Sequence, residues 1–217
     1  MNLSFILGSL AQAASLSLLI CCLSLLLAAA LSLAAGLSLF SAPTWLKRLA
    51  VLYVEIFRGT SLLVQLFWLY YALPLIGFSM PPLLTGILAL GLNTGAYGAE
   101  VVRGALRSVS EHQHEAARAL NFTRSQSLRH IILPQSLAEM LPPFSSLAVQ
   151  NLKDTSLVSM ITISELTFKA QELRNLTQDT VKIYGLTLLI YFALAMMIVF
   201  MIRRLERHVS KITGRLS

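Results

Sequence analysis

Polar side chains stand deep inside two long apolar runs of this sequence, and they are its candidates for chemistry. One run holds Asn93 and Glu100, and in the other Lys153 directly precedes Asp154. A charged side chain at the centre of a membrane helix costs roughly 3 kcal/mol on insertion scales, so it needs a functional or structural reason. An adjacent ammonium and carboxylate could meet the two charges of an amino acid. We therefore expect a polar solute cavity bordered by Asn93, Lys153, Asp154, Thr155 and Ser156.

A structural role is the competing explanation for these residues. Lys153, Asp154 and Glu100 could neutralise one another, or a charge of a second subunit, within a helix bundle. The glycines at positions 91, 95 and 98 carry a similar ambiguity. They could permit an unwound substrate-binding segment, but small residues at such spacings more often allow two helices to pack closely.

The composition indicates an integral membrane protein. Of the 217 residues, 56% are hydrophobic and only 12% are charged, against about 25% charged in soluble domains. Residues 1–46 contain no charged side chain, which is longer than the ~20 residues that one membrane span requires. We predict one all-α transmembrane domain over residues 1–217. Its five spans are expected at Ser15–Ala35, Gly59–Phe78, Leu83–Arg103, Phe144–Ser164 and Ile183–Ile202.

Basic residues between the predicted spans set the orientation. The connections on one side, together with the carboxyl-terminal tail, hold most of the 17 Lys and Arg residues, whereas the other side holds only Lys169, Arg174 and Lys182. Since cytoplasmic loops are rich in Lys and Arg, the amino terminus is predicted outside and the tail inside. The net charge of +7 then reflects topology and gives no reason to expect nucleic acid binding.

Residues 109–134 lie between two apolar runs and are expected to form a cytoplasmic loop. Glu115, Ala116 and Ala117 are followed by Leu120, which gives a short helix an apolar face. Asn121 can take the left-handed conformation that ends a helix, and Pro134 is expected to stop a second helical piece. The segment therefore predicts helix, turn, helix. A further amphipathic helix at Trp45–Arg58 is expected to lie at the membrane interface before the second span.

This loop resembles the EAA loop of the membrane subunits of bacterial ABC importers, with Asn121 in place of the family's Gly. Three further segments resemble the polar amino acid branch of these permeases. They are EIFRGTSLLVQ from Glu55, with Ser61 in place of the family's Pro, NTGAYGAE from Asn93, and KDTSL from Lys153. The four matches follow one another in order over residues 55–157. They place Ala96 and Glu100 among the candidate solute-binding residues.

The resemblance implies the fold, the partners and the mechanism. It implies a MetI-like permease of the bacterial cytoplasmic membrane that pairs with a second permease subunit, the same or homologous. Two cytoplasmic subunits would bind ATP and Mg²⁺, and an extracytoplasmic binding protein would deliver an amino-acid-type solute. Glu115, Ala116, Ala117, Leu120 and Asn121 would couple to the ATPase. The sequence holds no G-x-x-x-x-G-K-[ST] loop, so no cofactor and no ATPase activity are expected in this chain.

Two other classes of protein remain as alternatives. An ion-coupled secondary transporter could use Asp154, Lys153 and Glu100 as a proton relay, although the five spans show no inverted repeat. A membrane assembly factor would transport nothing and would need no charges at membrane depth. His112 and His114 are two residues apart and would point to different sides of a helix, so no metal site is expected.

Overall fold

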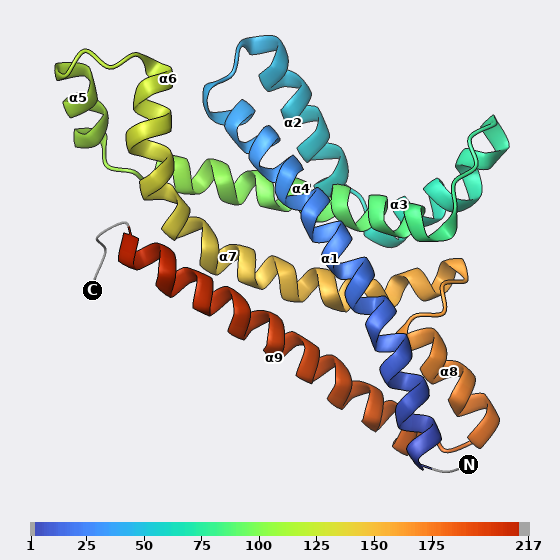
Figure 1. Cartoon of the computed structure of the whole chain (residues 1–217). Coiled ribbons are helices and arrows are strands. Elements are labelled where there is room, and N and C mark those ends of the chain that lie inside the picture. Colours follow the sequence, from blue (N-terminus) through green and yellow to red (C-terminus); the bar gives the residue numbers. More distant parts are fainter. Residues whose placement is uncertain (1–2, 213–217) are drawn as a thin grey trace.

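The computed structural model describes residues 3–212, and this part of the chain is helical with no strand. Helices occupy each of the five predicted spans, as the all-α prediction requires (Figure 1). By length and apolarity alone, α1 (Leu3–Ser41) and α9 (Thr180–Ile212) could each cross a membrane. The bent pair formed by α2 and α3 with its continuation is a third candidate. Arg215 of the predicted basic tail lies outside the described residues.

Helix α1 packs along α4 (Pro82–Arg107), and glycines allow the close approach. A Cβ on Gly98 would fall 2.0 Å from Ser32 Oγ, and one on Gly91 would fall 2.6 Å from a methyl carbon of Leu27. Both glycines lie within an unbroken α-helix. The glycines of α4 therefore serve close helix packing, the second of the two roles weighed from the sequence.

The amphipathic helix predicted at Trp45–Arg58 is present as α2 (Thr44–Gly59). The chain then bends by 103° into α3 (Leu62–Phe67), which continues as a π-helical turn, η1 (Trp68–Ala72), and a 3-10 turn, η2 (Leu73–Ile76). Gly77 ends this piece in the left-handed region, at φ 95°. The second predicted span is thus a short helix entered by a sharp corner.

The predicted loop contains α5 (Glu111–Ala119), and a second helix begins at α6 (Arg124–Ser127). The prediction that Pro134 stops this second helix is wrong. The helix passes through a π-helical segment, η3 (Leu128–Ile132), and continues as α7 (Leu133–Asp154), with Pro134 in its first turn. The amide of Leu133 bonds to the Leu128 carbonyl five residues back, and this wider turn accommodates a residue that lacks an N–H.

The helix that holds the start of the fourth predicted span begins well before Phe144, and Pro142 and Pro143 lie inside α7. Beyond α7 the chain tightens into a 3-10 helix, η4 (Thr155–Ile161), which ends at Thr162 with φ 66°. Helix α8 (Leu166–Thr177) follows and packs between α1 and α9.

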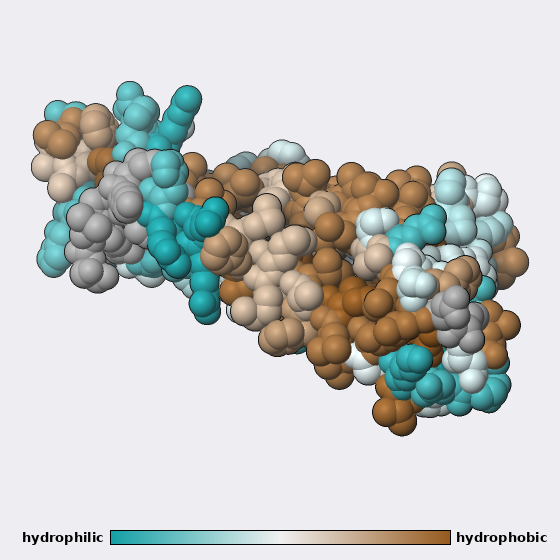
Figure 2. Space-filling view, turned by 60° about the horizontal axis from the view of Figure 1, so that its bottom comes forward, coloured by the Kyte–Doolittle hydropathy of each residue, from teal (hydrophilic) through white to brown (hydrophobic). Residues whose placement is uncertain are grey.

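The two ends of the molecule carry different elements. Figure 1 shows α8 near the amino terminus at one end, with α5, α6 and the carboxyl terminus at the other. In Figure 2 hydrophilic side chains gather over both ends, with a hydrophobic band between them. A long apolar middle between polar ends fits a protein that crosses a bilayer.

Candidate functional site

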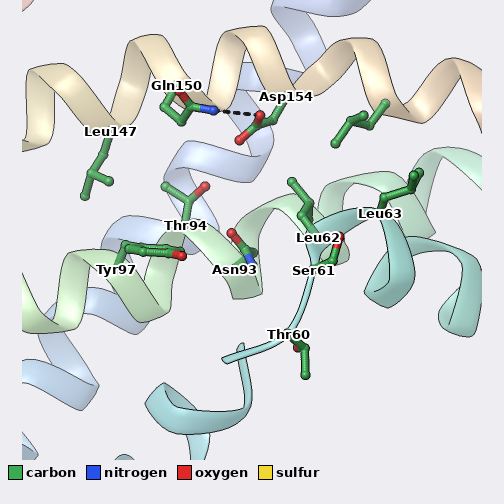
Figure 3. A pocket seen from close by; sticks show the side chains of 11 residues that line it. Thr60, Ser61, Leu62, Leu63, Asn93, Thr94, Tyr97, Leu147, Gln150 and Asp154 are labelled. Carbon is green, nitrogen blue, oxygen red and sulfur yellow. Dashed lines mark hydrogen bonds between the residues drawn. The ribbon is translucent and has the colours of Figure 1, made fainter. Parts of the chain in front are cut away.

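A polar pocket of about 640 Å³ lies where the start of α3, the middle of α4 and the end of α7 meet (Figure 3). Leucines supply its apolar walls. Its polar lining comes from all three elements and consists of Thr60, Ser61, Asn93, Thr94, Tyr97, Gln150 and Asp154. The pocket therefore joins two of the residues predicted from the sequence, Asn93 and Asp154.

Asn93 is fixed in the pocket wall by its amide nitrogen. Nδ2 donates to the Phe57 carbonyl at 2.9 Å and to Gln65 Oε1 at 3.2 Å. Gln65 in turn donates to Thr60 Oγ1 at 2.7 Å, which ties Asn93 to the corner between α2 and α3. The Asn93 oxygen has no donor among the described residues and points into the pocket (Figure 3). It is available to accept a hydrogen bond from a solute.

Asp154 stands on the opposite wall, at the end of α7. Its carboxylate accepts a hydrogen bond from Gln150 Nε2 at 2.8 Å, one helical turn away. A carboxylate has about four lone-pair sites, so one amide donor leaves most of its accepting capacity for other partners. Asp154 and the Asn93 oxygen together present acceptors to the same space, an arrangement suited to an ammonium group.

Lys153 does not share this pocket, although it is adjacent to Asp154 in sequence. It lines a second groove of about 640 Å³ between α7 and α9, together with Ser145, Ser146 and Arg203. Successive residues of an α-helix point about 100° apart, which carries the two side chains to different sides of α7. Gln150 lines both spaces and stands between them. The predicted Lys–Asp pair is therefore split by the helix.

Glu100 pairs with two arginines, and not with Lys153 as the structural explanation supposed. Arg103 Nε donates to Glu100 Oε2 at 2.8 Å, and Arg58 Nη1 lies 3.7 Å from Oε1. The Arg58 guanidinium also stacks over the Tyr97 ring, 5.2 Å from its centre. Glu100 thus belongs to an ion cluster beside the pocket and reaches its lining only through Tyr97.

The other predicted site residues do not line the pocket. Ala96 is buried on α4, and Thr155 is buried with its hydroxyl bonded to the Leu152 carbonyl at 2.7 Å. Ser156 is partly buried. The sequence interpretation missed Thr60, Ser61, Thr94, Tyr97 and Gln150 as lining residues. Gln150 carried a detectable signal, because it is a polar residue within a predicted span, four positions before Asp154.

A buried hydrogen-bond chain holds α7 behind the pocket. Ser24 Oγ on α1 donates to Asn151 Oδ1 at 2.8 Å, and Asn151 Nδ2 donates to Thr94 Oγ1 at 2.9 Å. Asn151 is fully buried, so both bonds are shielded from water. They fix the rotation of α7 and hence the direction in which Gln150 and Asp154 point.

The segment predicted to be a coupling loop, residues 109–134, has the predicted turn at its centre. Asn121 is left-handed, with φ 57°, and the Phe122 amide bonds to the Ala117 carbonyl at 3.0 Å. Together with the bond from the Asn121 amide to the Arg118 carbonyl at 2.9 Å, this is a Schellman motif. The expectation that Asn121 ends the first helix is confirmed.

The residues predicted for ATPase contact do not share one face of α5. Glu115, Ala116, Leu120 and Asn121 are exposed, and Leu120 is 67% accessible. Ala117 is only 1% accessible, because it faces back toward the helix bundle. Its small side chain seats α5 on the rest of the chain and is not part of an exposed docking face.

Comparison with known proteins identifies the family. Residues 27–211 match the family described as binding-protein-dependent transport system inner membrane component. The probable amino-acid ABC transporter permease protein y4tF of Sinorhizobium fredii is 48% identical over 96% of this chain and 90% of its own. The L-cystine transport system permease protein TcyB of Bacillus subtilis is 37% identical, over 87% and 83% of the two chains.

Solved structures agree with this assignment. A crystal structure of an amino acid ABC transporter with histidines superposes with a TM-score of 0.79 at 30% identity, covering 94% of this chain and 93% of that one. An inward-facing MetNI methionine ABC transporter superposes at 0.81 with 20% identity, covering 96% and 99%, and shows the shared fold. The chain belongs to the binding-protein-dependent transport system inner membrane component family, and it is a permease subunit of an ABC importer.

Proposed function

We propose that this permease, paired with a second permease subunit, forms the alternating-access path for a polar amino acid or amino-acid-like solute. An extracytoplasmic binding protein delivers the solute, and the complex lies in the bacterial cytoplasmic membrane. The observation that carries the proposal is the pocket in which the Asp154 carboxylate and the Asn93 oxygen face one space. The relatives named for amino-acid, cystine and glutamine transport support the solute class.

The pocket chemistry suits a zwitterion. Asp154 and Asn93 supply acceptors for an ammonium, as described above. Hydroxyls of Ser61 and Tyr97 line the same space and can donate to a carboxylate, whereas the Thr60 hydroxyl already donates to the Ile56 carbonyl at 2.7 Å. With both acceptors and donors in its lining, the site would orient an amino acid instead of only attracting its charge.

An apolar cluster lies next to the pocket on the side of the end that carries α8, and in this proposal it closes the path. Its buried members follow the pocket residues outward along each element: Leu66 on α3, Leu90 on α4, and Val158 and Ile161 on η4, with Ile20 on α1. Water and solute cannot cross close-packed aliphatic side chains. Entry from the outside therefore requires these elements to part, which is the movement that ATP binding in partner subunits would drive.

Lys153 takes a separate place in this proposal. It would meet the solute, if at all, in the groove between α7 and α9, beside Arg203. The solute carboxylate would then pass from the hydroxyls of the first pocket to a groove on the other side of Gln150, whose charged lining is Lys153, Arg203 and Glu206. Glu100, Ala96, Thr155 and Ser156 would shape the path without touching the solute in the first pocket.

Coupling to the ATPase is assigned to the exposed face of α5. Glu115, Ala116 and Leu120 would dock into a groove of a cytoplasmic subunit that binds ATP and Mg²⁺. The two hydrogen bonds of the Schellman motif at Asn121 would keep α5 at a fixed angle to the helix that leads to Asp154. A push on α5 would therefore reach the pocket through one continuous element.

The test is transport by the complete complex in vesicles. Asp154→Asn and Asn93→Ala should keep basal ATPase activity, while uptake falls about tenfold or the preference among amino acids shifts, since a hydrogen bond to a charged group is worth about 1.5–3 kcal/mol. Glu172→Gln is the matched control, because Glu172 is an exposed carboxylate on α8 that pairs with Lys169. Unchanged uptake and selectivity in both assembled pocket variants would refute the assignment of the pocket.

A further inference from the structure

A larger cavity, of about 830 Å³, lies at the opposite end of the molecule from α8. It is enclosed by the end of α1, the loop after α5, and the start of the helix formed by α6 and η3. Phe40 and Ser41 come from the last turn of α1, an apolar helix of 39 residues. The cavity therefore opens where a long apolar helix reaches its cytoplasmic end, at the level of lipid head groups.

The lining of this cavity combines an apolar floor with a basic rim. Phe40, Phe122, Leu128 and Ile132 contribute apolar surface. Arg118 and Arg124 contribute two guanidinium groups, and no acidic side chain lines the cavity. Neither guanidinium has a hydrogen bond or an ion pair among the described residues. Two exposed arginines without a protein partner, beside an apolar floor, suit an occupant that is anionic at one end and apolar at the other.

Hydroxyl groups complete the rim. Ser41, Ser125 and Ser127 line the cavity with the arginines. Neither Ser125 nor Ser127 donates its hydroxyl to a partner among the described residues. Phosphate oxygens accept hydrogen bonds from guanidinium and hydroxyl groups together, and arginine meets them with two parallel bonds.

The position of Ala117 decides from which direction the occupant comes. Ala117 lines the cavity and is almost fully buried, so the cavity lies on the bundle side of α5. Glu115 and Leu120, proposed above for ATPase docking, are exposed on the rest of the helix. A docking ATPase would cover those residues and leave this cavity facing the membrane surface.

We infer that this cavity binds the phosphate head group of an anionic phospholipid, with the upper part of an acyl chain against Phe40 and Ile132. Basic pockets between helices on the cytoplasmic side of a membrane bind such head groups. The lipid would bridge the end of α1 to the turn at Phe122. It would thereby steady the coupling loop, independently of which solute the complex carries.

Native mass spectrometry of the purified permease–ATPase complex tests this inference. The complex is exchanged into phosphatidylglycerol or phosphatidylcholine, and bound lipid is counted. We expect retained phosphatidylglycerol in the unaltered complex, and roughly 30-fold weaker binding after the double change Arg118→Gln and Arg124→Gln, because each arginine near an anionic surface contributes independently. Arg129→Gln is the control, since Arg129 is exposed on η3 but does not line the cavity.

Further variants and measurements distinguish a phospholipid from other possible occupants of the cavity. A double Arg→Lys variant keeps both charges and should retain most of the binding, which answers any failure of the glutamine variant to assemble. Equal retention of phosphatidylcholine, or no difference between the glutamine variant and the Arg129 control, would overturn the lipid assignment. Displacement of the lipid by millimolar inorganic phosphate would show a site for free phosphate instead. Unchanged lipid with a lost ATPase subunit in the glutamine variant would make the cavity a protein-docking site.

Discussion

The carboxylate of Glu165 accepts a hydrogen bond from the Ser17 hydroxyl at 3.1 Å, which fastens the start of α8 to α1 across 148 positions of sequence. Ser17 Oγ also accepts the Leu166 amide at 3.0 Å, and Tyr191 on α9 donates to the same carboxylate at 3.0 Å. The other carboxylate oxygen accepts the Phe168 amide at 2.9 Å and so caps α8. Three helices thus converge on one fully buried carboxylate.

Removing this carboxylate should loosen the outer end of the bundle. Glu165→Ala leaves the Ser17 and Tyr191 hydroxyls without their acceptor and removes a helix cap, so we expect a loss of about 3–5 kcal/mol. Thermal unfolding in nanodiscs measures it as a lower melting temperature. Glu165→Gln keeps one acceptor and should lose less. The matched control, Glu172→Ala, removes an exposed carboxylate from the same helix and should change little.

The left-handed turn at Asn121 should prefer glycine. Asn121→Gly should be neutral or stabilising by up to about 1 kcal/mol, because glycine enters this region without strain, whereas Asn121→Val should destabilise the loop by at least about 1–2 kcal/mol. The readout is the amount of ATPase subunit that co-purifies with the permease. Equal recovery with valine and glycine would show that the turn does not govern docking.

Ala117 and Leu120 should fail in different ways. A bulky charge in Ala117→Arg has no room on the buried side of α5, so the variant should lower the melting temperature of the permease itself. Leu120→Arg stands in solvent and should leave permease stability unchanged while reducing ATPase assembly. Both properties are measured on the same preparations by size-exclusion chromatography and thermal unfolding. If both variants still assemble with the ATPase subunit, α5 is excluded as the docking helix.

The close packing of α1 against the glycines of α4 gives a prediction that a second glycine of the same helix can control. Gly98→Ala would place a Cβ 2.0 Å from Ser32 Oγ and 2.9 Å from Ser32 Cβ, so the helices must separate at a cost of about 1–3 kcal/mol. Gly104→Ala lies further along the same helix with open space around it, and it should be neutral or stabilising. The difference between their melting temperatures is the test, and equal values would contradict the close contact.

Membrane orientation is tested by labelling single cysteines. With Cys21 and Cys22 replaced by serine or alanine, Ser125→Cys should react only with a reagent that has entered the cell, whereas Gln178→Cys should react from outside. Both positions are exposed in the isolated chain. Because Ser125 lines the cavity proposed above for a phospholipid, the readout is the side from which each position reacts and not the extent of its reaction. Labelling of the two positions from the same side would refute the predicted topology.

Sequence reasoning succeeded where the signal was local. The turn at Asn121 depends on one residue's backbone preference and needs no knowledge of distant contacts. The orientation also depends only on local charge counts, and it stays a prediction. It failed at Pro134, where the usual proline rule was overridden by a widened helical turn in η3. That widening involves the backbone of the whole segment and has no marker in the proline itself.

The polar pocket was only partly predictable for a geometric reason. Polar residues at membrane depth pointed to Asn93 and Asp154, but the rotation of α7 decides which neighbour of Asp154 shares its pocket. That rotation is fixed by Asn151, through bonds to Ser24 and Thr94 on two other helices. Glu165 was missed for a related reason, because its three partners come from separate parts of the chain.

The continuous helix from Arg124 to Asp154 has a mechanical consequence. At 1.5 Å per residue it forms a rod of about 45 Å with the predicted coupling loop at one end and the Asp154 carboxylate at the other. Asn151 ties the rod to its neighbours close to the carboxylate end, which makes that tie a fulcrum with unequal arms. A displacement of several ångströms at the loop would then become a displacement of only a fraction of that distance at Asp154. Such gearing would convert a large, weak movement at the ATPase into a small, forceful one at the pocket.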